Sequence, residues 1–128
     1  MTRAVAKQML IASSVVLALM GGAATFAPVE LLRGLALDST GPVVIMVQLL
    51  GALYLAFATT NWTAKGSPIG GIYSRPISLG NQLHFTVGAI ALAKYAGTHG
   101  GSPVLLGLLA AYSVFAVGFG LLVFGRVE

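Results

Sequence analysis

The chain has 128 residues, of which 57% are hydrophobic and only 8% are charged. A soluble domain carries about a quarter of its residues as charged side chains, so this composition excludes a soluble protein. It also excludes a disordered segment, and the lack of cysteine excludes a disulfide scaffold and thiol chemistry. The formal net charge of +4 comes from scattered basic residues. These form no phosphate-tracking stripe, so we expect no nucleic-acid partner.

Charge-free apolar stretches predict four transmembrane helices, over residues 5–26, 42–64, 76–95 and 103–124. Each reaches the length of about 20 residues that crosses a bilayer. Pro42, Pro76 and Pro103 stand where three of these helices begin, because a proline in the first turn sacrifices no hydrogen bond. Glycines after the second and third stretches indicate turns. We therefore expect an all-α fold, with residues 1–128 forming a single integral membrane four-helix bundle.

The first predicted span also has features of a signal peptide. Its basic start, apolar middle and small residues near its end are also typical of a secretory signal peptide, whose cleavage would leave three spans. The apolar run is longer than the usual 7–15 residues of such peptides, which favours a retained span.

After the first predicted span, Pro28 marks a helix start, and Leu31, Leu32 and Leu35 share one face. This pattern predicts a short interfacial helix over residues 28–37.

Lysine and arginine residues near the helix ends predict the orientation. With the N-terminus inside, five lie on the inner side, namely Arg3, Lys7, Lys65, Arg75 and Arg126, and two on the outer side, Arg33 and Lys94. By the positive-inside rule, both termini then face the cytoplasm.

Polar side chains within the spans carry most of the functional information, because they are costly in hydrocarbon. None of the four predicted spans contains Asp or Glu, which disfavours carboxylate-driven transport and a buried cation site. The third span has the densest polar set. Helical periodicity predicts an interior face with Ser78, Asn81, Gln82, His84, Phe85 and Gly88, and a lipid face with Leu79, Leu83, Val87 and Ile90.

The end of the second span and the inner connection lie at a similar depth to the start of this polar face. We therefore predict one inner-side ligand-binding pocket formed by Asn61, Trp62, Tyr73, Arg75, Ser78, Asn81, Gln82 and His84. The alternative is that the amides only hydrogen-bond neighbouring helices, that His84 is a satisfied donor, and that Trp62 and Tyr73 anchor the interface. The sequence leaves both open.

The inner connection from Lys65 to Pro76 is rich in glycine and proline but also contains Ile69, Ile72 and Tyr73, so we expect an ordered loop. It lacks a GxxxxGK[ST] pattern, which argues against nucleotide binding. Two interpretations remain. In the first, the backbone and basic side chains of the loop hold a phosphate or carboxylate. In the second, Lys65, Tyr73 and Arg75 anchor the loop to lipid headgroups.

Metal and enzyme chemistry are not expected. His84 and His99 are the only histidines, and the topology places them at different depths, so we predict no metal site and no haem. No nucleophile–base pair or carboxylate pair is evident, so we expect a protein that is not an enzyme.

The layout resembles the small bacterial four-helix membrane proteins loosely grouped as DoxX-like. The resemblance covers nearly the whole chain and rests on Phe26 and Pro28 after the first span, on Asn61-Trp62 at the end of the second, and on the GlyGlyIleTyrSerArgPro and LeuGlyAsnGlnLeuHisPhe stretches. It implies a multi-pass protein of the bacterial cytoplasmic membrane, and for some members a role as a subunit of quinone-linked oxidoreductases. No motif carries that role onto particular residues here.

Three functions are therefore considered. The first is a non-enzymatic protein that binds a lipid, a quinone or another amphipathic molecule in the inner-side pocket, with no resident cofactor required. The second is an accessory or assembly subunit of a larger membrane complex. The third is a homo-oligomeric small channel or transporter. Small residues spaced four apart in several spans allow close helix approach within one chain or between copies, so they leave the oligomeric state open. Membrane lipids are expected partners in each case.

Overall fold

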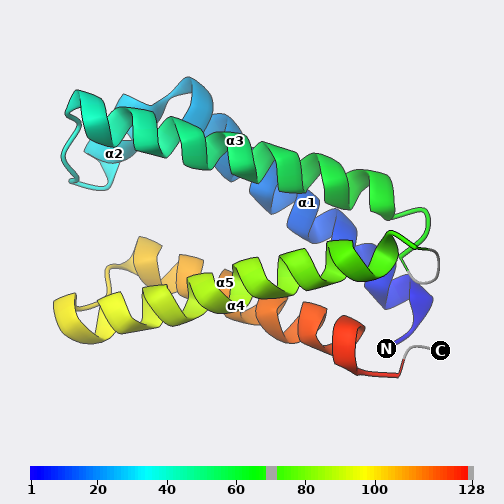
Figure 1. The fold of residues 1–128 in the computed structure, drawn as a ribbon. Helices are drawn as coiled ribbons and strands as arrows, with labels where there is room; N and C mark the ends of the chain where they lie inside the picture. The colour runs from blue at the N-terminus through cyan, green and yellow to red at the C-terminus, as the bar shows by residue number, and fades with distance from the viewer. Residues whose placement is uncertain (69–71, 127–128) are drawn as a thin grey trace. The chain divides into compact units, whose positions relative to one another are not determined.

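The computed structural model describes residues 1–68 and 72–126, and these ranges contain five α-helices and no strand. The helices are α1 (Arg3–Phe26), α2 (Pro28–Gly34), α3 (Gly41–Ala64), α4 (Ser74–His99) and α5 (Pro103–Phe124) (Figure 1). The all-α class is as predicted. The middle of the inner connection, which we expected to be an ordered loop, lies outside the described residues.

In the described part of the chain, three helices are long and apolar enough to cross a membrane: α1, α3 and α5. The predicted fourth span corresponds to α4, which is the longest helix at 26 residues. Polar side chains lower the mean hydropathy of α4, so it does not qualify as a span by composition alone. The predicted number of four spans is therefore supported only in part.

Local sequence signals set most helix ends. Helix α5 begins at Pro103, as predicted, and the Ser102 hydroxyl accepts a hydrogen bond from the Leu105 amide at 3.2 Å. Helix α4 is longer than predicted at both ends. It begins two residues before Pro76. A proline is tolerated in the first turn, because the amide hydrogen that it lacks would have no acceptor within the helix. It also continues through Gly97 and stops at Gly100, whose φ of +78° ends the helix.

Helix α2 ends at Gly34, earlier than the predicted residue 37. The Leu37 amide donates to the Leu32 carbonyl at 2.9 Å, and the Ala36 amide donates to the Arg33 carbonyl at 3.0 Å. Together these two bonds form a Schellman motif, in which the residue after the C-cap adopts a left-handed backbone conformation. Ala36 takes that position with a φ of 55°, where glycine is the usual residue.

The chain divides into two compact units. The first, Leu10–Thr63, contains most of α1 together with α2 and α3, and we call it the α1–α3 unit. The second combines Met1–Met9 with Ala64–Glu128, and we call it the α4–α5 unit. The single domain over residues 1–128 stays a prediction.

Small residues bring α1 and α3 close together in the α1–α3 unit. A Cβ atom added to Gly51 would lie 2.9 Å from the Thr25 amide nitrogen and 3.0 Å from Ala24 Cβ. A Cβ added to Gly21 would lie 2.9 Å from Leu55 Cγ. The two antiparallel helices therefore meet where side chains are smallest, as is common for helix pairs in membranes (Figure 1).

Polar side chains also link α1 to α3. The Ser14 hydroxyl donates to the Ala58 carbonyl at 2.7 Å, and the Asn61 amide donates to the Ser13 hydroxyl at 3.0 Å. At the other end of the pair, the Gln48 amide lies 3.4 Å from the Thr25 carbonyl that accepts its hydrogen bond. Bonds of this kind stabilise helix pairs in membranes by about 0.6 kcal/mol each.

An aromatic core joins α4 to α5 in the α4–α5 unit, where the two helices run antiparallel (Figure 1). The fully buried Phe85 ring stacks on Phe119 with ring centroids 5.7 Å apart, and it packs against Phe115 at 4.9 Å. Its edge-to-face contact with Tyr112 spans 5.1 Å. Offset and edge-to-face contacts of this kind each add about 0.5–1.5 kcal/mol beyond area burial.

Large apolar side chains remain exposed along the long helices. On α3 they are Ile45, Met46, Leu49, Leu50 and Leu53, and on α5 they include Val104, Leu106, Val114, Val117 and Leu121. Continuous apolar surface of this extent is unfavourable in water and suits hydrocarbon. The exposed faces thus agree with the composition in indicating a membrane protein.

Candidate functional site

His84 and Tyr112 form a polar pair between α4 and α5. The Tyr112 hydroxyl oxygen and His84 Nε2 lie 3.1 Å apart, and which of them donates depends on the imidazole tautomer. The two rings are tilted by 52° with their centroids 5.3 Å apart. His84 follows the first residue of α4 by ten positions, which places it about 15 Å along the helix axis. This pair is therefore far from both ends of α4.

Gly88 allows Tyr112 to reach this position. A Cβ atom on Gly88 would lie 2.6 Å from Tyr112 Cδ1 and would contact Cε1 more closely still. Only a residue without a side chain leaves room for the phenol ring against the α4 backbone. The glycine thus fixes the depth at which the Tyr112 hydroxyl meets His84, one turn away on the same helix.

Gln82 contributes a second polar group on this side of α4. Its amide nitrogen donates to the Thr86 hydroxyl at 2.9 Å, whereas its buried carbonyl oxygen Oε1 accepts no hydrogen bond from any described residue. The carboxamide lies over Gly120 of α5, where an added Cβ would be 3.4 Å from both polar atoms of the amide. A buried carbonyl without a donor costs about 1–3 kcal/mol, so Gln82 is an expensive residue for helix packing alone.

The predicted division of α4 into two faces is present. Ser78, Asn81 and Phe85 are buried, and Asn81 donates to the Ile77 carbonyl at 2.9 Å. The predicted lipid face, formed by Leu79, Leu83, Val87 and Ile90, is exposed. Periodicity thus identified the inward face of the helix correctly.

The other predicted site residues lie apart from His84. Tyr73 precedes α4, Arg75 belongs to its first turn, and both are exposed, with 73% of the Tyr73 surface accessible. Arg75 is nine residues from His84, or about 13 Å along the axis. Tyr73 and Arg75 therefore mark the end of α4 rather than its polar middle.

Asn61 and Trp62 belong to the α1–α3 unit. Asn61 is fully buried there and donates to Ser13, as described above, while Trp62 is 50% exposed. The Ser13 hydroxyl in turn donates to the Leu10 carbonyl at 3.1 Å. Asn61 thus has a helix-linking role within its own unit, and the single pocket that would combine it with His84 stays a prediction.

Sequence reasoning missed Tyr112 and Ser13 as partners of predicted site residues. A signal for Tyr112 was present, because Gly88 and Tyr112 are equally distant in sequence from the turn at Gly100. In an antiparallel hairpin with a short connection, such positions face each other at the same depth. A tyrosine opposite a glycine therefore predicts a ring packed on the helix backbone.

Comparison with protein-family models, with curated proteins and with solved structures finds no match for this chain. Over the described residues, no three His, Asp or Glu side chains converge as a set of metal ligands.

Proposed function

We propose that the chain is a four-span protein of a bacterial cytoplasmic membrane, with both termini in the cytoplasm. The apolar exposed face of α4, its 26-residue length and its antiparallel packing against the apolar α5 support a fourth span. In this arrangement the polar residues of α4 face protein rather than lipid. A reporter fused after residue 99 should then lie outside the cytoplasm and one fused at the C-terminus inside it, whereas a chain in which α4 does not span would give the reverse.

We further propose that the protein is non-enzymatic and binds an amphipathic molecule, such as a lipid or a quinone, on the polar face of α4. The observation that carries this proposal is the His84–Tyr112 pair, together with the unsatisfied Gln82 carbonyl two residues from His84. An imidazole and a phenol at this depth offer both a donor and an acceptor to a carbonyl or headgroup oxygen. Intramembrane ionisable groups are functional candidates by default.

The test is mass spectrometry of the small molecules that copurify with the full chain in mild detergent. We expect His84→Leu to lose the bound molecule and Tyr112→Phe to retain less of it, because Tyr112→Phe removes only the hydroxyl that meets His84. His99→Leu is the matched control, since His99 is exposed at the end of α4. Circular dichroism verifies that each variant is folded. Equal retention by His84→Leu and the wild-type chain, or no amphipathic molecule in the wild type, would refute the proposal.

A further inference from the structure

Gln82 and Thr86 form a hydrogen-bonded pair one turn apart on the same side of α4. Gln82 Nε2 donates to the Thr86 hydroxyl oxygen at 2.9 Å, and Gln82 Oε1 is left as an acceptor without a donor in the described part of the chain. The Thr86 hydroxyl accepts this bond, so its own proton remains to be donated. Thr59 and Thr98 donate that proton to carbonyls of their own helices, whereas Thr86 donates to no carbonyl of the described residues. The pair therefore offers one unused acceptor and one unused donor.

The pair lies at the edge of the contact between α4 and α5, where both of its side chains are half-buried. A Cβ atom added to Gly120 of α5 would lie 3.4 Å from both polar atoms of the Gln82 carboxamide. The carboxamide thus lies over bare backbone, and no side chain at residue 120 fixes its orientation. The last torsion of a glutamine side chain is broad, so a rotation about it turns the covered Oε1 toward a group that arrives from the helix surface.

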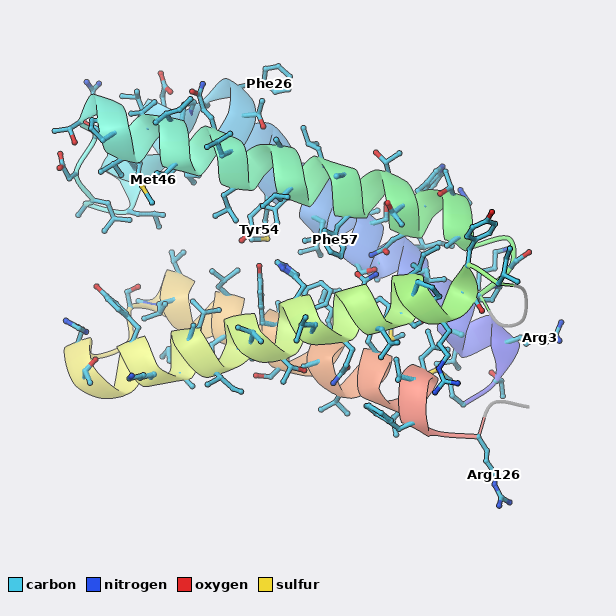
Figure 2. All side chains as sticks on the ribbon, in the orientation of Figure 1. Arg3, Phe26, Met46, Tyr54, Phe57 and Arg126 are labelled. Atoms are coloured by element: carbon cyan, nitrogen blue, oxygen red, sulfur yellow. The ribbon has the colours of Figure 1, made fainter. Side chains whose placement is uncertain are left out.

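The helices around the pair carry no charge. There is no Asp, Glu, Lys or Arg in α4 between Arg75 and Lys94, and there is none in α5. Arg126 lies beyond the end of α5 (Figure 2). Gln82 lies about 12 Å from the first residue of α4 along the helix axis, and Thr86 lies about 18 Å from it. A charged headgroup at this depth would find no opposite charge on the two helices and would be costly in hydrocarbon.

Hydrogen-bond complementarity then selects the polar group of the ligand. A carbonyl or ether oxygen accepts from Thr86 but leaves Gln82 Oε1 unpaired. An ammonium group donates to Oε1, but it is charged and has no lone pair for the Thr86 proton. A hydroxyl group satisfies both atoms without a charge, because it has one proton to donate and two acceptor lone pairs.

We propose that the ligand of the polar face of α4 is a neutral lipid with a free hydroxyl group, which donates to Gln82 Oε1 and accepts from the Thr86 hydroxyl. This inference rests on the proposed function and adds the chemical class of the ligand to it. A diacylglycerol has this chemistry, since it has one free hydroxyl, no charge and acyl chains that stay in the hydrocarbon. A quinol has the same chemistry on an aromatic ring.

The experiment measures the binding of dioleoylglycerol and its methyl ether, supplied in equal amounts, to the full chain in detergent micelles by native mass spectrometry. The ether keeps the oxygen acceptor of the alcohol and lacks the proton that Gln82 Oε1 would accept. The wild-type chain should bind the alcohol about fivefold more tightly, which is the usual effect of one hydrogen bond. Decylhydroquinone and its dimethyl ether form a second probe pair, which distinguishes an aromatic from a glycerol hydroxyl. Preference for the hydroxyl member of either pair supports the proposal.

Two variants separate the two hydrogen bonds. Gln82→Leu removes the acceptor, so it should bind the alcohol and the ether equally and bind the ether as the wild-type chain does. Thr86→Val removes the donor that serves both probes, so it should weaken both about fivefold and keep the preference for the alcohol. Thr59→Val is the matched control, because the Thr59 hydroxyl already donates to the Leu55 carbonyl at 2.9 Å in the α1–α3 unit. This control should bind both probes as the wild-type chain does.

Equal binding of the hydroxyl and ether members of both probe pairs by the wild-type chain would overturn the proposal, as would binding of none of them. A preference for the alcohol that survives Gln82→Leu would also overturn it. These results are distinct from a failure of the proposed function, which is tested by the copurifying molecule and His84→Leu. Loss of that molecule in His84→Leu, together with equal binding of alcohol and ether, would refute only the hydroxyl ligand. Circular dichroism verifies that each variant is folded.

Discussion

Adjacent glycines in α1 provide a direct test of how α1 and α3 pack. A Cβ atom on Gly21 would lie 3.0 Å from the Gly51 carbonyl oxygen, 3.0 Å from the Leu55 amide nitrogen and 2.9 Å from Leu55 Cγ. A Cβ on Gly22 would meet no atom of the described residues within 4 Å. Two of the three atoms near Gly21 are backbone atoms of α3, which cannot rotate away as a side chain can. Alanine at position 21 therefore forces the helices apart, whereas alanine at position 22 does not.

The magnitude follows from comparing the two substitutions. Both replace a mid-helix glycine by alanine, which favours the helix by roughly 0.5–1 kcal/mol in each case. This gain is the same at the two sites and cancels in the difference. Overpacking a well-packed contact costs about 1–3 kcal/mol. We therefore expect Gly21→Ala to be less stable than Gly22→Ala by about 1–3 kcal/mol.

The assay is reversible unfolding of the purified full chain in detergent micelles with an increasing fraction of sodium dodecyl sulfate, followed by far-ultraviolet circular dichroism. Gly22→Ala should unfold at the same or a higher fraction than the wild-type chain, and Gly21→Ala at a lower one. If the two variants unfold together, Gly21 does not lie at the close contact between α1 and α3. If Gly22→Ala were less stable than the wild-type chain, the face of α1 that carries Gly22 would also be packed.

Three further predictions use the same purified chain. Gly88→Ala should destabilise it by about 1–3 kcal/mol relative to Gly107→Ala, because Tyr112 covers Gly88, whereas no described atom lies within 4 Å of a Cβ at Gly107. Equal unfolding midpoints would contradict this packing. Gln82→Leu should leave stability unchanged or raise it, since it removes a buried carbonyl without a donor, and should lower retention of the copurifying molecule; a clear loss of stability would indicate that the amide is needed for packing. Trp62, the only tryptophan, is half exposed near the end of α3. Lipids brominated near the headgroup should therefore quench its fluorescence more than lipids brominated at the end of the acyl chain. The reverse order would place the indole deep in the hydrocarbon.

Helix positions were predictable because their signals act within one turn. The ends of α1 at Phe26, of α3 at Ala64 and of α5 at Phe124 agree with the predicted ranges. The ends of α4 differ, because a helix accepts proline anywhere in its first turn and accepts a glycine such as Gly97 when the next turn still forms. The sequence marks where a helix can stop, and the backbone at Gly100 decides where it does.

Partners across helices were not predictable from periodicity alone. The inward face of α4 followed from the spacing of its polar residues, but the contact of His84 with Tyr112 depends on which residue of α5 lies opposite. Similarly, Gly21 and Gly22 are indistinguishable in the sequence, and only the packing against α3 separates their roles. Periodicity gives the direction of a side chain, whereas pairing also requires the register between helices.

The polar groups of the two units differ in how they are satisfied. In the α1–α3 unit, Ser14 and Asn61 donate to α1 or α3 partners. The Thr25 hydroxyl there has no hydrogen-bond partner among the described residues, but it lies where α1 is tightly packed on Gly51, so the small side chain itself is needed. Gln82 differs, because a leucine would fill similar volume without burying a carbonyl that lacks a donor. Helix association gains only about 0.6 kcal/mol from a hydrogen bond, which is less than the cost of about 1–3 kcal/mol for that carbonyl. A glutamine at this position, two residues from His84, therefore favours a ligand-binding role for the polar face of α4 over a purely structural one.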